Sequence, residues 1–103
     1  MKIIEKIVDR IDEEIHDSKE YAKLATEVKE SHPALSHVLF TISTQEDAHQ
    51  AMLHEQVVKL IEQYRREHGD PPAAMMAVYE HHHRKSMEKL AEARRYQDIY
   101  KEA

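Results

Sequence analysis

The feature that most constrains this chain is the scarcity of residues that interrupt helices. Its 103 residues contain one glycine and three prolines, and all four fall within two short segments, ESHPAL and HGDPPAA. Pro33 suits the first turn of a helix and disfavours helix at the residue before it. Gly69 can close a helix, Asp70 can cap the next one and Pro71 can begin it. The sequence therefore predicts an all-α fold. Three helices are expected, over residues 2–30, 34–67 and 72–101.

Length and composition restrict the classes of function. A chain of this length supports a single modest core, so residues 1–103 are expected to form one domain, an antiparallel helical hairpin over 2–67 followed by the third helix. The absence of cysteine excludes a disulfide and a thiolate metal site. The net charge of -5 argues against a nucleic-acid partner. No apolar run approaches a membrane span, and MKIIEKIVDR is too charged for a signal peptide, so we expect a cytoplasmic protein without membrane contact.

Glu14 interrupts an apolar face of the first helix. The other residues of that face follow alternating steps of three and four, and they are Ile4, Ile7, Ile11, Ser18, Tyr21, Ala25 and Val28. Glu14 comes seven residues after Ile7 and seven before Tyr21. The neighbouring acidic residues fall off this face, so the spacing singles out Glu14.

Glu46 and His49 interrupt the corresponding face of the second helix. The remaining residues of that face are Leu35, Leu39, Ile42, Leu53, Gln56 and Leu60. In an antiparallel hairpin that turns near residue 32, the level of Glu14 agrees with that of Glu46 and His49 within roughly one helical turn. Buried carboxylates must be neutralised, paired or bound to a cation, and neither face carries Lys or Arg at this height. The pattern predicts a divalent-metal site formed by Glu14, Glu46 and His49.

The segments IDEEIHDSKEYAKLA and LFTISTQEDAHQAMLHEQV resemble the first helix pair of the ferritin-like superfamily, in particular rubrerythrins and encapsulated ferritins. The resemblance covers roughly residues 3–60. It depends on a Glu seven residues before an aromatic residue, here Glu14 and Tyr21, and on a later Glu-x-x-His, here Glu46 and His49. The resemblance implies a ferritin-like four-helix bundle that is completed by dimerisation and holds a di-iron centre shared between two subunits.

The same resemblance implies roles for the four residues. Glu46 would bridge two irons, Glu14 would be a terminal carboxylate, and His49 would bind one iron through a ring nitrogen. Tyr21 is similar to a tyrosine that orients a carboxylate or supplies an electron. The implied activity is ferroxidase-like oxidation of ferrous iron by dioxygen or peroxide, for iron handling or protection from oxidants. These four residues are the expected catalytic set.

The partners are also inferred from the resemblance. Ferritins and rubrerythrins carry a second helix pair with its own ligands, whereas this chain has one further helix without a matching set, so a homodimer or higher oligomer is expected. An encapsulating shell protein is a further candidate partner, with the chain inside a nanocompartment. However, the C-terminal YQDIYKEA differs from the short apolar tail that addresses such proteins to it.

Two other groups of residues are weaker candidate metal ligands. Glu13, His16 and Asp17 either form a solvated acidic surface or collect cations beside Glu14. Glu80 and His83 repeat the Glu-x-x-His spacing; we expect His83 to pack at a polar edge, the alternative being a second metal site. The remaining histidines of interest, His37, His54, His68, His81 and His82, are expected at the surface, and Met75, Met76 and Met87 are expected to pack in the interior.

Two further functions remain open on the sequence alone. The chain could be a non-enzymatic helical oligomerisation or interaction module, whose polar residues fix helix register and oligomeric state. It could also be a structural metal-binding protein that holds zinc or another divalent ion such as manganese, for which the nine histidines are suitable.

Overall fold

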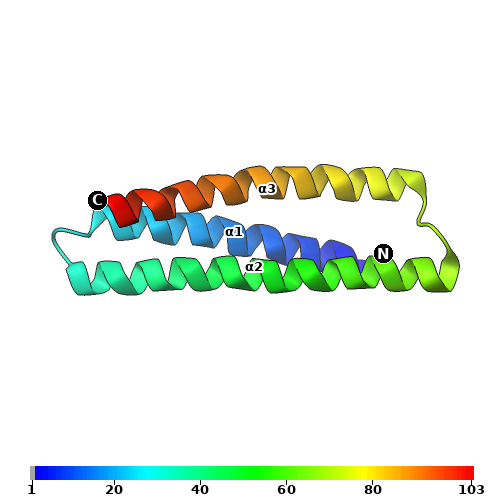
Figure 1. Cartoon of the computed structure of the whole chain (residues 1–103), viewed down its shortest axis with the longest axis horizontal. Coiled ribbons are helices and arrows are strands. Elements are labelled where there is room, and N and C mark those ends of the chain that lie inside the picture. The colour runs from blue at the N-terminus through cyan, green and yellow to red at the C-terminus, as the bar shows by residue number, and fades with distance from the viewer. Residues whose placement is uncertain (1) are drawn as a thin grey trace.

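The computed structural model describes residues 2–103, which form three long helices and no strand (Figure 1). Helix α1 spans Lys2–Glu27, α2 spans Pro33–His68 and α3 spans Ala73–Glu102. They lie side by side and alternate in direction, in a rod of 56 × 18 × 18 Å. The rod is about as long as the 36-residue α2, because an α-helix rises about 1.5 Å per residue. The all-α prediction and the expected order of a hairpin followed by a third helix are confirmed.

The turn between α1 and α2 begins earlier than expected. Helix α1 ends at Glu27 rather than at residue 30, and residues 28–31 form a turn. Three backbone hydrogen bonds hold it, from the Val28 N–H to the Leu24 carbonyl at 3.1 Å, from the Lys29 N–H to the Thr26 carbonyl at 3.4 Å and from the His32 N–H to the Val28 carbonyl at 2.8 Å. Pro33 then occupies the first turn of α2, as predicted, where its missing N–H needs no partner.

The second connection differs from the prediction at the beginning of α3. Gly69 ends α2 as expected: its φ of 80° lies in the left-handed region that favours glycine, and its N–H donates to the Arg65 carbonyl at 3.0 Å. However, α3 begins at Ala73 with Pro72 at the N-cap and no side-chain cap, so the predicted capping role of Asp70 and the predicted first helical position of Pro71 are both wrong. Pro71 and Pro72 both precede the helix because each fixes an extended residue before it.

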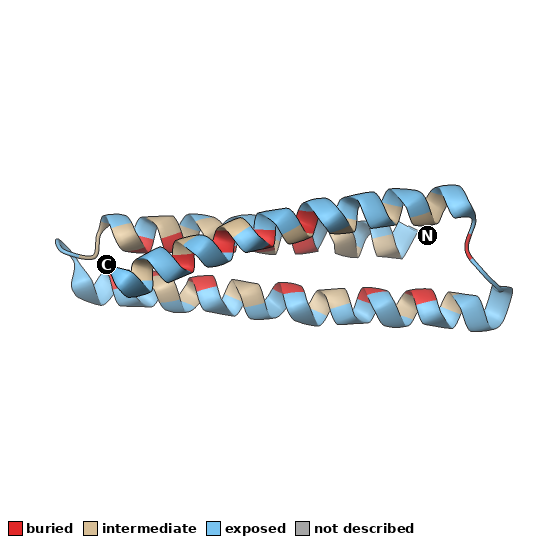
Figure 2. Ribbon diagram, turned by 45° about the horizontal axis from the view of Figure 1, so that its top comes forward, coloured by how far each residue is buried: buried red, intermediate tan, exposed pale blue. Residues whose placement is uncertain are grey.

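The core is divided into an apolar half and a half made of small and polar residues. Around the N-terminal half of α1, the buried cluster consists of Ile11, Ile15, Val57, Ile61 and Leu90. Towards the α1–α2 turn, the buried residues are mostly small or polar, and they are Ser18, Ala22, Ala25, Ser36, Leu39, Ser43, Ala93 and Gln97. Figure 2 shows these buried positions as a narrow line along the facing sides of the helices. Small side chains let α1 and α2 approach each other closely in the half of the rod towards the α1–α2 turn.

Ser18, Ser43 and Gln97 form a hydrogen-bonded layer that joins all three helices. The Ser18 hydroxyl donates to the Ser43 carbonyl at 2.9 Å, and the Ser43 hydroxyl donates to the Ser18 carbonyl at 2.6 Å. The amide of Gln97 donates to both hydroxyl oxygens at 3.1 Å. Because buried polar groups are costly unless they are paired, this layer favours one register of the hairpin and one position of α3.

The predicted buried face of α2 is wrong in its direction. The buried residues of α2 are Ser36, Leu39, Ser43, Gln50, Val57 and Ile61, and only Leu39 belongs to the predicted face. The row of large apolar residues on α2 lies beside the line of contact with α1, because the close approach of the two helices leaves room there only for smaller residues such as Ser36 and Ser43. Leu35 is consequently 49% exposed.

Helix α3 covers only one side of the hairpin. It contacts α2 through the stacked rings of Phe40 and Tyr100, whose centroids are 4.3 Å apart, and through the ion pair of Asp47 with Arg94. It contacts α1 through Ser86, whose hydroxyl donates to Asp12 at 2.7 Å. The opposite side of the hairpin has no helix over it. None of the helices within residues 2–103 is long and apolar enough to cross a membrane.

Candidate metal site

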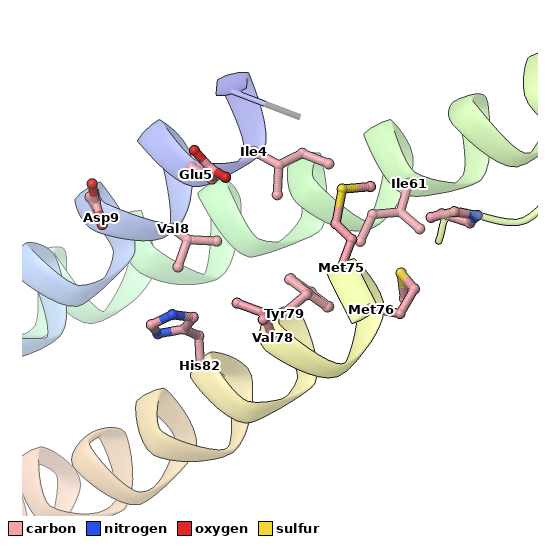
Figure 3. A pocket seen from close by; sticks show the side chains of 11 residues that line it. Ile4, Glu5, Val8, Asp9, Ile61, Met75, Met76, Val78, Tyr79 and His82 are labelled. Atoms are coloured by element: carbon pink, nitrogen blue, oxygen red, sulfur yellow. The ribbon is translucent and has the colours of Figure 1, made fainter. Parts of the chain in front are cut away.

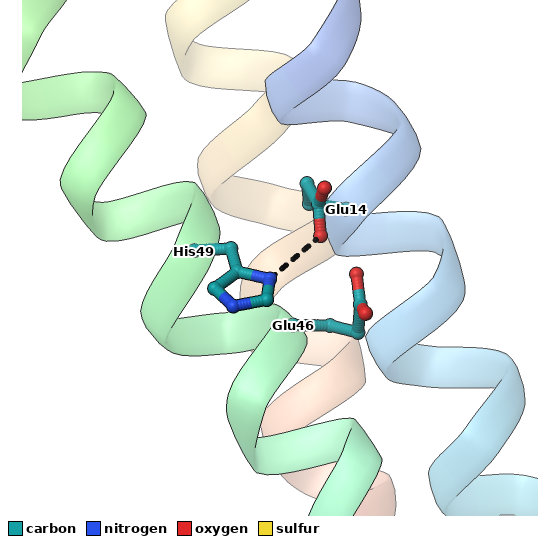
Figure 4. A group of neighbouring side chains, drawn as sticks. All are labelled: Glu14, Glu46 and His49. Atoms are coloured by element: carbon teal, nitrogen blue, oxygen red, sulfur yellow. Dashed lines mark ion pairs between the residues drawn. The ribbon is translucent and has the colours of Figure 1, made fainter.

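The middle of the hairpin brings together the three residues that the sequence predicted. Glu14 extends from α1 towards Glu46 and His49 of α2, and α3 passes behind them (Figure 4). The Ser18–Ser43 contact lies one helical turn away and sets the register that aligns these residues. The site therefore lies on the side of the hairpin that α3 leaves open. We call this side the outer face and define it by Glu14, Leu24, Leu35, Val38, Ile42, Glu46 and His49.

The three side chains are close enough to bind a single ion. One ligand atom from each of Glu14, Glu46 and His49 lies within 4.8 Å of the others, and no other such group of three occurs among residues 2–103. Glu14 Oε2 lies 3.4 Å from His49 Nδ1. Two carboxylates and an imidazole on one side of an ion leave its other coordination positions open. This geometry agrees with the predicted grouping of the three residues.

The site lies at the rim of the single chain rather than inside its core. The Glu14 side chain is 27% exposed and that of His49 is 54% exposed, so the expectation of a fully buried position is wrong for one subunit. The cause is the rotation of α2 described above. Nevertheless, Glu14 Oε2 is itself buried and accepts no hydrogen bond. An unsatisfied buried carboxylate oxygen is costly, and a bound cation would remove this cost.

The neighbouring Glu14 carboxyl changes the protonation of Glu46. The pKa of Glu46 is raised to about 7, mainly because its protonated form can hydrogen-bond the neighbouring Glu14 carboxyl. Burial and the negative charge of Glu14 raise it further, while His49 acts in the opposite direction. Neither Glu14 nor Glu46 forms an ion pair with Lys or Arg in the part of the chain that the structure describes. A divalent cation is therefore a suitable partner for this pair.

Tyr21 lies on the same side of α1 as Glu14 but outside the group of three. It is half-buried and lines a shallow surface groove together with Asp17, Glu20 and Leu24. Its predicted role next to a carboxylate stays a prediction.

The acidic candidates beside the site are surface residues. Glu13 forms an exposed ion pair with Arg10 at 2.9 Å, and His16 and Asp17 are exposed. None of the three joins the ligand group. The charge of Asp17 reaches the site, because it contributes to the raised pKa of Glu46.

The second Glu-x-x-His segment forms no comparable group. Glu80 is exposed, whereas His83 is half-buried and stacks on His54, with ring centroids 4.8 Å apart and an interplanar angle of 17°. Nearly parallel stacked rings direct their nitrogen lone pairs into separate planes, so this pair does not converge on one ion. His83 also stacks on Tyr79, with ring centroids 6.1 Å apart, and His81 and His82 are exposed as expected.

The surface position predicted for His54 is wrong. His54 is half-buried between α2 and α3, and burial, followed by the nearby His83, lowers its pKa. His37 and His68 are exposed as expected. Met76 and Met87 pack against the apolar cluster, also as expected, and Met75 is half-buried.

The sequence reasoning missed a pair that holds the ligand-bearing turn of α2. Arg94 of α3 donates to both oxygens of Asp47, at 3.1 and 3.2 Å, and Gln50 donates to Asp47 at 3.1 Å. Asp47 directly follows Glu46, so this contact fixes the turn that carries the ligands. The spacing of Asp47 and Gln50 on one face of α2 was the available signal, but Arg94 lies 47 residues away in the sequence.

Comparisons of the chain with protein-family models, with curated proteins and with solved structures give no match.

Proposed function

We propose that this protein is a ferritin-like di-iron carboxylate protein with ferroxidase-like activity, and that Glu14, Glu46 and His49 bind the iron. The single observation that carries the proposal is the convergence of these side chains, one of whose oxygens is buried without a hydrogen-bond partner. A set of one imidazole and two carboxylates is hard enough for iron, manganese or zinc. The motif resemblance favours iron among these.

The outer face supports completion of the site by a second copy of the chain. Leu24, Leu35 and Val38 are 43%, 49% and 53% exposed, and helical spacing puts them on the same side of the hairpin as the ligands, two to three turns nearer the α1–α2 turn. Apolar residues gathered next to a half-exposed site mark a contact surface. Two hairpins packed on this face would supply four carboxylates and two imidazoles, the ligand number of di-iron helical bundles. The second copy would also exclude water from His49.

The chain's own residues would perform three tasks. Glu14 and Glu46 offer carboxylate oxygens that balance the charge of the bound ions, and His49 offers one neutral ring nitrogen. Glu46 would release its proton when a cation binds, because its raised pKa keeps a fraction of it protonated near neutral pH. The Asp47–Arg94 contact holds the turn in place. Bound iron would supply the redox chemistry, in which ferrous ion loses an electron to dioxygen or peroxide.

The test is ferrous iron added without oxygen to protein purified without a histidine tag, followed by air. We expect about one iron per chain and a ferric absorbance that develops on oxidation. Glu46→Ala should abolish this absorbance. Glu80→Ala is the matched control, because Glu80 belongs to the other Glu-x-x-His segment and is exposed. Equal oxidation rates for Glu46→Ala and the unaltered protein would contradict the proposal.

The same measurements separate the competing functions. A structural zinc site would bind zinc through the same three residues, with no oxidation of iron. An interaction module would assemble through the outer face without metal, and Glu46→Leu would then strengthen assembly by removing a half-buried charge.

A further inference from the structure

The end of the rod that contains the α1 N-terminus holds an apolar groove that is separate from the candidate metal site. It lies between α1 and the beginning of α3, and it encloses about 440 Å³ (Figure 3). Pockets for small molecules usually fall between about 300 and 1,000 Å³. Ile61 of α2 and the buried Pro71 also line it. The groove is independent of Glu14, Glu46 and His49, none of which lines it.

The walls are apolar and adaptable. Ile4 and Val8 project from successive turns of α1, and Met76 and Tyr79 of α3 also line the groove. All four are half-buried, so they are held by the core and still offer surface to a ligand. The thioether of methionine adjusts to varied shapes, and the Tyr79 ring can lie against an apolar body or a cation. Burial raises the pKa of Tyr79, which keeps its hydroxyl neutral.

The rim on the α1 side is acidic. Glu5 and Asp9 stand four residues apart on α1, beside the apolar row of Ile4 and Val8, and both are exposed. No Lys or Arg is among the described residues that line the groove; His82 is the nitrogen-bearing side chain on the facing wall. An apolar floor next to two carboxylates complements a molecule with an apolar body and one positive charge. An anion of the same shape would be repelled.

We propose that this groove binds small amphiphilic cations, such as a lipophilic amine, with the apolar body on Ile4, Val8 and Tyr79 and the positive group beside Glu5 and Asp9. The assignment follows from the shape of the groove and from the position of its charges. It does not depend on metal binding at the hairpin.

Three probes of matched shape test the proposal at pH 7.5 and low salt: 4-phenylbutylamine, 4-phenylbutanol and 4-phenylbutanoate. Binding is followed by the NMR shifts of isoleucine and valine methyl groups in the full-length protein. The amine should shift Ile4, Val8 and Val78, and it should bind about fivefold more tightly than the alcohol, the gain expected from a partly exposed ion pair. The carboxylate should bind more weakly than the alcohol.

Two sets of variants assign the effect to this groove. Glu5→Gln with Asp9→Asn should bring the amine to the affinity of the alcohol and leave the alcohol unchanged. Glu27→Gln with Glu30→Gln removes the same charge at the opposite end of the rod and should change neither. Val78→Trp, at a side chain that is 58% exposed, should fill the mouth and weaken both probes without disturbing the fold.

Several results would overturn the assignment. Equal affinity of the amine and the carboxylate would show that the acidic rim has no role. The same conclusion would follow if the Glu5/Asp9 and Glu27/Glu30 double variants lost equal affinity for the amine. Methyl shifts confined to other regions, or no shift at millimolar probe, would remove the site. Broadening of the groove methyls that grows with protein concentration would indicate that a second copy of the chain occupies the groove instead.

Discussion

Glu46→Gln changes how the stability of the metal-free protein depends on pH. The native pKa of Glu46 is about 7 against an ordinary value of 4.5, so the folded state binds its proton more tightly than the unfolded state does. The stabilisation is complete below pH 4.5 and is lost as the pH rises through 7. Glutamine cannot ionise and retains a donor for the Glu14 carboxylate, so it preserves the low-pH arrangement at every pH.

The expected magnitude follows from this difference. Without any screening by solvent, a pKa shift from 4.5 to about 7 corresponds to about 3.4 kcal/mol in the free energy of unfolding. The carboxyl is only half-buried, and contact with water reduces the effect, so we expect about 1 kcal/mol. Glu46→Gln should therefore match the unaltered protein at pH 4.5 and exceed its stability by about 1 kcal/mol at pH 8, or about 4–8 °C in Tm.

The assay is urea unfolding followed by circular dichroism, at fixed protein and salt concentrations and with a chelator present. Comparing the two proteins at each pH cancels the titration of the nine histidines, which they share. Glu62→Gln is the control, because Glu62 is an exposed carboxylate on the same helix. A stability difference of the same size at pH 4.5 and pH 8 would show that Glu46 has an ordinary pKa and that Glu14 does not stabilise its protonated form.

Four further outcomes are expected. His49→Ala should reduce ferrous-iron or zinc affinity by at least tenfold in a calorimetric titration while stability stays within about 0.5 kcal/mol, and unchanged affinity would remove His49 from the ligand set. Gln97→Leu should cost about 1–3 kcal/mol in urea unfolding, because it leaves two serine hydroxyls without their donor; a neutral result would mean that the layer adds no stability. Ile15→Ala should cost about 2–5 kcal/mol, because Ile15 is 1% exposed, whereas a loss below 1 kcal/mol would indicate a loosely packed core. Val38→Lys should abolish self-association in sedimentation without lowering stability, and Val78→Lys should leave association intact; association that survives Val38→Lys would exclude the outer face as the interface.

The sequence was sufficient for the helices and for the grouping of the three ligand residues. The helices follow from the positions of Pro33 and Gly69, because these residues act through local backbone geometry. The ligands follow from counting residues on either side of the turn, because helices are regular in length. Both are local or nearly local properties, and a single sequence contains them.

The direction of the core and the contacts of α3 could not be obtained in the same way. Large apolar residues predicted one buried face of α2, but the close approach of α1 selects the serines beside it. The pairing of Asp47 with Arg94 and the stacking of His54 on His83 depend on how α3 lies against the hairpin. That position is set by the Ser18, Ser43 and Gln97 layer, whose partners are 54 and 79 residues apart.

The uneven core has a consequence for motion. The half near the α1–α2 turn buries mainly alanine, serine and glutamine, so it gains less from excluding water than the isoleucine-rich half does. Amide hydrogens there should exchange with deuterium sooner, while those around Ile15 and Val57 exchange only when the whole chain unfolds. The candidate metal site lies at the boundary between these two halves of the core. An ion held by α1 and α2 would therefore slow amide exchange mainly in the serine-rich half.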